Sequence, residues 1–150
     1  MESKLPLLRR LDHIGIAVKD LDSAVAFYSN AYGVTDWERI ELPERHMAVA
    51  VCHIGDMMLE LITPTSDEAA FALFLKEKGE GVHHLAYEVD DVEAALRAVE
   101  SKGVRLVDAH ARPGIHDTHV AFLHPTATMG ILTELVQLPR IDQEGVGGHA

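Results

Sequence analysis

The sequence predicts an α+β protein in which two βαβββ modules form a single domain over residues 1–150. One observation is an internal repeat: DHIGIAVKDLDSAVAFY, which begins at Asp12, aligns without gaps with HHLAYEVDDVEAALRAV, which begins at His83. The other is the order of patterns, because each copy has an alternating stretch typical of a strand, an acidic residue, and then the periodicity of a helix. A length of 150 residues with 47% hydrophobic content is enough for one domain with a proper core.

A helix is expected directly after the first strand of each copy. Asp20 in the first copy, and Asp90 or Asp91 in the second, are expected to cap these helices because their carboxylates can accept the free amides of the first turn. Apolar residues then recur every three or four positions, which predicts one buried stripe along each helix. The stripes comprise Leu21, Val25 and Tyr28 in the first helix, and Val92, Leu96 and Val99 in the second.

The remaining strands follow in the same order in both halves. Segments 47–55 and 57–64 flank Gly55 and Asp56, a pair typical of a hairpin turn, whereas 119–125 and 131–139 flank a longer connection. These patterns place the two modules at about 10–64 and 80–138, with a linking helix at about 65–79. The Gly-rich tail, about 143–150, is expected to be disordered.

Composition restricts the function classes. The chain has 24 acidic and 13 basic residues, a formal net charge of -11, and no basic stripe, so we expect no nucleic-acid partner. No apolar run approaches the length of a membrane span, and the N-terminal residues do not have the pattern of a signal peptide. The single cysteine, Cys52, excludes an internal disulfide and favours a reducing, cytoplasmic location, with the thiol buried.

Four polar residues in predicted strands form a candidate metal site. His13 aligns with His84, and Glu60 in LELITP aligns with Glu134 in TELVQLP at a slightly larger spacing. Each is flanked by apolar residues, and Gly15 and Ala86 on the histidine faces leave space beside the rings. A single His or Glu in a strand is usually solvent-facing or satisfied, but isolated surface residues have no reason to recur at matching positions. The sequence therefore predicts a His₂Glu₂ site for one divalent ion, with Co, Mn, Ni, Zn or Fe favoured over Mg.

Strict alternation along a strand predicts different roles for the adjacent histidines of HHLAYE. Because neighbouring side chains point to opposite faces, His83 and His84 are not expected to serve one site. His84 is the expected ligand because it aligns with His13. His83 aligns with Asp12 and is expected to support the site from outside or to lie at the surface.

The same stretches carry a resemblance to a known family. LDHIGIAVKDLDSAVAFY, LELITP, GEGVHHLAYEVDDVEAAL, KGVRLVD, FLHP and GILTELVQ resemble the vicinal oxygen chelate superfamily (glyoxalases, bleomycin resistance proteins and dioxygenases), and most closely its methylmalonyl-CoA epimerase family. This resemblance implies paired βαβββ modules that form a cupped mixed sheet around one metal, usually in a homodimer. It also implies metal ligands at His13, Glu60, His84 and Glu134, an acyl-CoA substrate, and epimerisation through a metal-stabilised enolate.

Epimerisation needs an acid and a base on opposite faces of the reacting carbon. The resemblance implies Glu134 as one of these groups. Several bacterial family members have a second glutamate near the position of Val49, which is apolar in this chain, so Glu44 in LPER is the expected substitute, although an exposed turn is an equally good interpretation. The stretch 111–122 also departs from the family. Its His116, Asp117 and His119 are interpreted as a polar rim, with proton carriage as the alternative.

Other activities of the same superfamily remain alternatives. A glyoxalase I-type isomerase would use the same ligands, and GEGVHH with FLHP favours the epimerase over it. A ring-cleaving dioxygenase would use two histidines and one carboxylate, so Glu60 argues against it. A drug-sequestering protein would generally lack the ligands. Lys76, Lys78, Lys102, Arg105 and Arg112 are the cations expected to offset the negative charge of an acyl-CoA.

Overall fold

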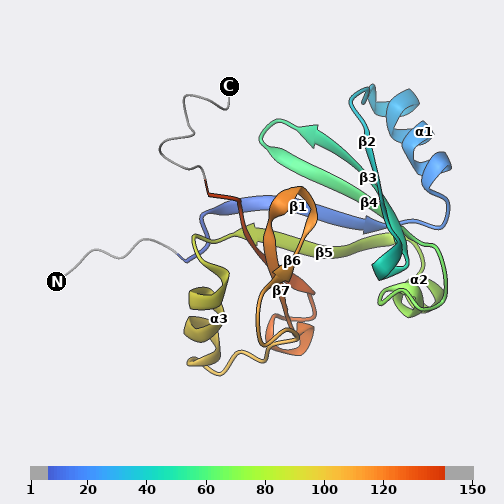
Figure 1. Ribbon diagram of the computed structural model, residues 1–150. Coiled ribbons are helices and arrows are strands. Elements are labelled where there is room, and N and C mark those ends of the chain that lie inside the picture. The colour runs from blue at the N-terminus through green and yellow to red at the C-terminus, as the bar shows by residue number, and fades with distance from the viewer. Residues whose placement is uncertain (1–6, 141–150) are drawn as a thin grey trace, which may run out of the picture.

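The computed structural model describes residues 7–140, which form one eight-stranded mixed sheet with helices packed on it (Figure 1). The strand order is β2-β3-β4-β1-β5-β8-β7-β6. The strands span β1 Arg10–Ala17, β2 Glu38–Leu42, β3 Met47–Ile54, β4 Met57–Pro64, β5 Gly81–Glu88, β6 Arg112–Pro113, β7 His119–Leu123 and β8 Thr133–Gln137. The helices span α1 Leu21–Tyr32, α2 Ala72–Lys78 and α3 Val92–Glu100, with short 3-10 turns at Pro43–Arg45, Ile115–Asp117 and Pro125–Ala127.

The topology confirms the predicted α+β fold of paired βαβββ modules. In each half the first strand pairs in parallel with the last, β1 with β4 and β5 with β8, and the halves join where β1 and β5 pair antiparallel. The second strand of each half is the element that the sequence did not locate. β2 (ERIEL) is a charged edge strand, and β6 is two residues long and contains Pro113, which an edge strand tolerates.

Helices α1 and α3 cover one face of the sheet, and the other face lines a cavity, with α2 packed at its side against Val49, Val51 and Ile62. Asp20 accepts hydrogen bonds from the amides of Asp22 and Ser23, and Asp91 accepts one from that of Ala94, so both predicted caps are confirmed. The α1 stripe packs with β3 and β4, and the α3 stripe packs with β7 and β8. Cys52 is buried under α1. The inward-facing side chains of both halves line a cavity of about 760 Å³.

The connection between the modules is partly helical. Helix α2 covers seven residues, and the preceding residues 65–71 form bends and turns. The tail that the sequence predicts to be disordered lies outside the described residues. Within residues 7–140, no helix is both long enough and apolar enough to cross a membrane.

Candidate metal centre and cavity

Four adjacent central strands each contribute one buried polar side chain to the floor of the cavity. Glu60 comes from β4, His13 from β1, His84 from β5 and Glu134 from β8, and each is only 4–7% exposed. Pairing sets them side by side, because Gly15 lies opposite both Glu60 and His84, and Ala86 lies opposite both His13 and Glu134. The two-residue period of the strands then turns all four side chains to the same face.

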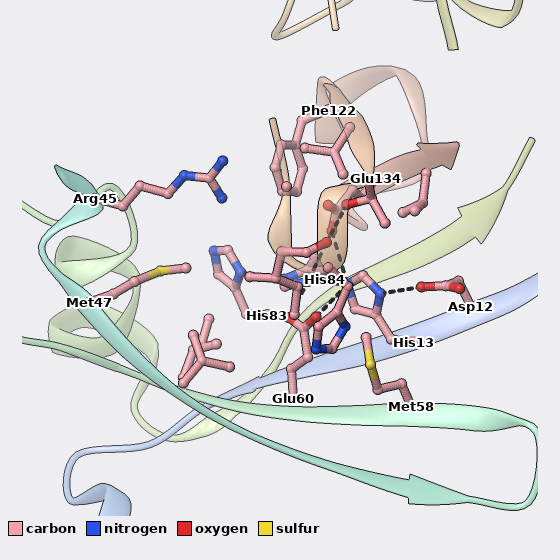
Figure 2. A pocket seen from close by; sticks show the side chains of 18 of the residues that line it. Asp12, His13, Arg45, Met47, Met58, Glu60, His83, His84, Phe122 and Glu134 are labelled. Carbon is pink, nitrogen blue, oxygen red and sulfur yellow. Dashed lines mark hydrogen bonds and ion pairs between the residues drawn. The ribbon is translucent and has the colours of Figure 1, made fainter. Parts of the chain in front are cut away.

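The four side chains converge on one point (Figure 2). His13 Nε2 lies 3.2 Å from His84 Nε2 and 3.1 Å from Glu134 Oε1, and His84 Nε2 lies 3.2 Å from Glu134 Oε1. The Glu60 carboxylate is looser, with one oxygen 3.4 Å from His13 Nε2 and the other 3.9 Å from His84 Nε2. Ligand atoms that each lie about 2.1 Å from one ion are separated by about 3 Å when they meet it at right angles. The spacing of His13, His84 and Glu134 therefore fits one divalent ion, and the Glu60 carboxylate lies beside these three side chains at longer distances.

The electrostatics of the cluster also favour a cation. Burial alone would lower the pKa of His13, but its hydrogen bonds to Asp12 and Glu134 and the charge of Glu60 raise it to about 10. Burial opposes ionisation of both carboxyls and raises the pKa of Glu60, whereas hydrogen bonds from His13 and His84 more than offset burial and lower the pKa of Glu134. Without an ion, a proton on His13 supplies the positive charge that the carboxylates require. A divalent cation would replace that proton.

Two β-bulges place a partner beside each histidine. Between β1 and β5 the register skips Asp12 on one strand and His83 on the other, so each is an extra residue immediately before a candidate ligand. The Asp12 carboxylate accepts a hydrogen bond from His13 Nδ1 at 2.8 Å, and His83 Nδ1 lies 2.9 Å from His84 Nδ1. The expectation that His83 and His84 face apart is wrong here, because both line the cavity. A one-residue bulge removes the alternation on which that expectation depended.

Gly15 provides the space for the His84 ring. A Cβ built on Gly15 would lie 2.1 Å from His84 Cε1, far inside contact distance, so only glycine fits beneath the ring in this arrangement. The small residue that the sequence marked as leaving room over the sheet therefore lies directly under a candidate ligand.

Of the other predicted site residues, Glu44 and His116 line the cavity, whereas Asp117 and His119 do not. Glu44 is exposed in the 3-10 turn Pro43–Arg45 and lines the cavity, and Val49 forms part of its buried apolar wall. His116 Nε2 lies 2.8 Å from Glu38 Oε1 and so links the 111–122 stretch to β2 of the other half. His119 is exposed and is not part of the cavity wall.

The cations of the cavity differ from most of those expected. Of the five proposed from sequence, Arg112 lines the cavity, whereas Lys76 pairs with Asp67 and Lys78 lies over the ring of Phe74. Arg10, at the start of β1, and Arg45, in the 3-10 turn Pro43–Arg45, also line the cavity, and no pattern in the sequence predicted this. Arg45 donates a hydrogen bond to the carbonyl of Pro113 across the mouth.

Comparisons with known proteins identify the family. Residues 12–122 match the Glyoxalase/Bleomycin resistance protein/Dioxygenase superfamily. The chain belongs to this superfamily. It is 39% identical to the mitochondrial methylmalonyl-CoA epimerase of Homo sapiens, over 87% of this chain and 74% of that protein, and 38% identical to the Bos taurus enzyme, over 87% and 75%. A solved structure of a methylmalonyl-CoA epimerase in complex with methylmalonyl-CoA and NH4+ superposes with a TM-score of 0.84 at 37% identity, covering 90% of this chain and 98% of that one.

Proposed function

We propose that this protein is a metal-dependent epimerase that interconverts the 2R and 2S forms of methylmalonyl-CoA. The observation that carries the proposal is the cluster of two histidines and two glutamates on the floor of a cavity of about 760 Å³. The epimerases to which the chain is similar over most of its length are the second support. A metal site suits this reaction because the proton at C2 of the substrate, between a thioester and a carboxylate, is only weakly acidic. Its removal requires stabilisation of the negative charge that develops.

The chain's own residues would hold the ion and leave room for the substrate. His13, Glu60, His84 and Glu134 would be the ligands of one divalent ion, with Co, Mn, Ni, Zn and Fe all compatible with the mixed nitrogen and oxygen donors. When bound, the ion supplies Lewis acidity that stabilises negative charge on the substrate oxygens as the C2 proton leaves. Asp12 keeps the His13 ring oriented through the hydrogen bond at Nδ1.

Proton transfer is assigned to two carboxylates from different halves of the molecule. Inversion at C2 requires one group to remove a proton from one face and another group to return a proton to the opposite face. Glu134 on β8 is buried at the floor, and Glu44 lies in the turn between β2 and β3 at the mouth. The walls between them include Met47, Val49 and Phe122, whose apolar side chains limit the access of water to the reacting carbon.

The remaining parts of the proposal concern partners and location. Arg45 and Arg112 at the cavity wall would offset part of the negative charge of an acyl-CoA on an otherwise acidic protein. A homodimer and a cytoplasmic location complete the proposal, the first from the family resemblance and the second from the single buried Cys52. Light scattering during gel filtration tests the dimer, because a mass of one chain would contradict it.

The decisive experiment for the assigned roles uses the Glu44→Gln variant in D₂O with the two epimers of methylmalonyl-CoA supplied separately. If Glu44 serves one face and Glu134 the other, inversion of both epimers should slow by about 10²–10⁴-fold. Deuterium should still enter C2 with retention of configuration in the epimer whose C2 proton faces Glu134, whereas exchange of the other epimer should slow together with its inversion. Glu41→Gln is the matched control, because Glu41 is an exposed β2 residue that does not line the cavity. Inversion at an unchanged rate in Glu44→Gln would exclude Glu44 from the chemistry.

A further inference from the structure

The two bulge residues occupy equivalent positions of the repeat but differ in chemistry. Asp12 and His83 are both the extra residue before a histidine of the metal cluster, and each contacts the Nδ1 atom of that histidine. Asp12 is buried, and its other carboxylate oxygen pairs with Arg10 at 3.2 Å, so its hydrogen-bonding capacity is used within the protein. His83 is half-buried, and only its Nδ1 has a protein partner among residues 7–140.

The contact with His84 fixes which nitrogen of His83 carries the proton. His84 Nε2 is the atom that faces the cluster. An imidazole that binds an ion through Nε2 carries its proton on Nδ1, so His84 donates from Nδ1 to Nδ1 of His83. Because His83 Nδ1 is then the acceptor, the proton of neutral His83 must reside on Nε2. Binding of an ion to His84 therefore makes His83 Nε2 a hydrogen-bond donor.

The surroundings of His83 direct this donor to the cavity. The ring packs against Phe71 and Phe74, with ring centres 5.5 Å and 5.0 Å away, so two aromatic side chains hold it in place. Every buried side-chain nitrogen and oxygen in the described residues has a hydrogen-bond partner. His83 Nε2 has no such partner, so this atom is not buried. Because the His83 ring lines the cavity, Nε2 is open to the cavity. Arg45 lines the same cavity as His83 (Figure 2).

We propose that His83 is a substrate-binding residue, whose Nε2–H donates a hydrogen bond to the free carboxylate of the acyl group. This inference rests on the proposed function. A neutral N–H donor in a cavity that also contains the cationic Arg45 is suited to an anionic oxygen, whereas Phe122 and Val49 in the same lining are apolar. Asp12 and His83 thus each accept a hydrogen bond from a histidine of the cluster, but His83 has a second polar atom that can bind the substrate.

The test separates substrate binding from metal binding with two variants of His83. His83→Phe keeps the aromatic packing and removes both nitrogens, and His83→Gln restores a side-chain N–H. Calorimetric titration of the Co²⁺-loaded proteins with an equilibrated mixture of methylmalonyl-CoA epimers measures binding without net reaction. Propionyl-CoA is the matched ligand because it lacks the carboxylate. The affinity for Co²⁺ and the visible spectrum of the bound ion are measured for each variant by competition with a chelator.

We expect His83→Phe to bind methylmalonyl-CoA roughly ten- to a hundredfold more weakly, because the variant lacks one hydrogen bond to a charged group. Co²⁺ affinity should fall in His83→Phe, because His84 loses the acceptor at its Nδ1, so both ligands are titrated with the site saturated with Co²⁺. Binding of propionyl-CoA should then be unchanged, and His83→Gln should recover most of the loss in methylmalonyl-CoA affinity. Equal methylmalonyl-CoA affinity in His83→Phe, or an equal loss for both ligands, would overturn the proposal. Failure of the unaltered, Co²⁺-loaded protein to bind methylmalonyl-CoA would instead overturn the proposed function.

Discussion

The position of the His84 ring over Gly15 can be tested by adding a single methyl group at Gly15. In Gly15→Ala the new Cβ would lie 2.1 Å from His84 Cε1 and 2.5 Å and 2.6 Å from the two ring nitrogens. The ring would have to withdraw by about 1.3 Å to reach 3.4 Å, where ordinary contact begins. Metal sites tolerate displacements of only about 0.2 Å, so the ring cannot both clear the methyl group and keep its place in the cluster.

We therefore expect Gly15→Ala to bind Co²⁺ roughly ten- to a hundredfold more weakly, as measured by competition with a chelator of known affinity. The free energy of unfolding of the metal-free protein should fall by about 1–3 kcal/mol because the interior is overpacked. Gly81→Ala is the matched control, since Gly81 is also a strand residue and a Cβ there would meet nothing within 4 Å. Unaltered Co²⁺ affinity in Gly15→Ala would refute the placement of His84 over this glycine.

The metal cluster and the core give three further expected outcomes. The pKa of His13 is about 10 without an ion, so binding of Co²⁺ must release the proton of His13. Co²⁺ affinity, measured by competition with a chelator, should therefore rise about tenfold per pH unit from 6.5 to 8.5. An affinity that does not change with pH would contradict this. Asp12→Asn should weaken Co²⁺ binding about ten- to a hundredfold in the same assay, since the charged acceptor at His13 Nδ1 is lost. Leu96→Ala, on the buried face of α3, should lower the free energy of unfolding in urea by about 2–5 kcal/mol and leave Co²⁺ affinity unchanged. Loss of both stability and Co²⁺ affinity would show that this side of the sheet supports the cluster.

The repeat made the central part of the structure predictable. Aligning His13 with His84 and Glu60 with Glu134 places equivalent residues on equivalent strands, and two modules that pair through their first strands bring all four to one face. The fold class, both helix caps and the hairpin at 55–56 also follow from local patterns whose physical basis is short range.

What the sequence did not reveal depends on register and on contacts between the halves. A bulge adds one residue to a strand and has no characteristic residue type by which it could be recognised. The two-residue alternation of a strand therefore could not predict that Asp12 and His83 point into the cavity. The charged strand β2 lacks the apolar alternation by which strands are recognised, because it is an edge. The pairing of His116 with Glu38 joins residues from different modules, and no local pattern encodes it.

The central claim is that an ion held by His13, Glu60, His84 and Glu134 enables proton exchange at C2 of methylmalonyl-CoA. The most direct measurement is mass-spectrometric uptake of deuterium at C2 in D₂O by protein stripped of metal, and by the same protein refilled with Co²⁺. We expect background exchange in the stripped protein, rapid uptake of one deuterium after refilling, and loss of that uptake in Glu134→Ala. No exchange above background in protein that demonstrably binds Co²⁺ would contradict this claim.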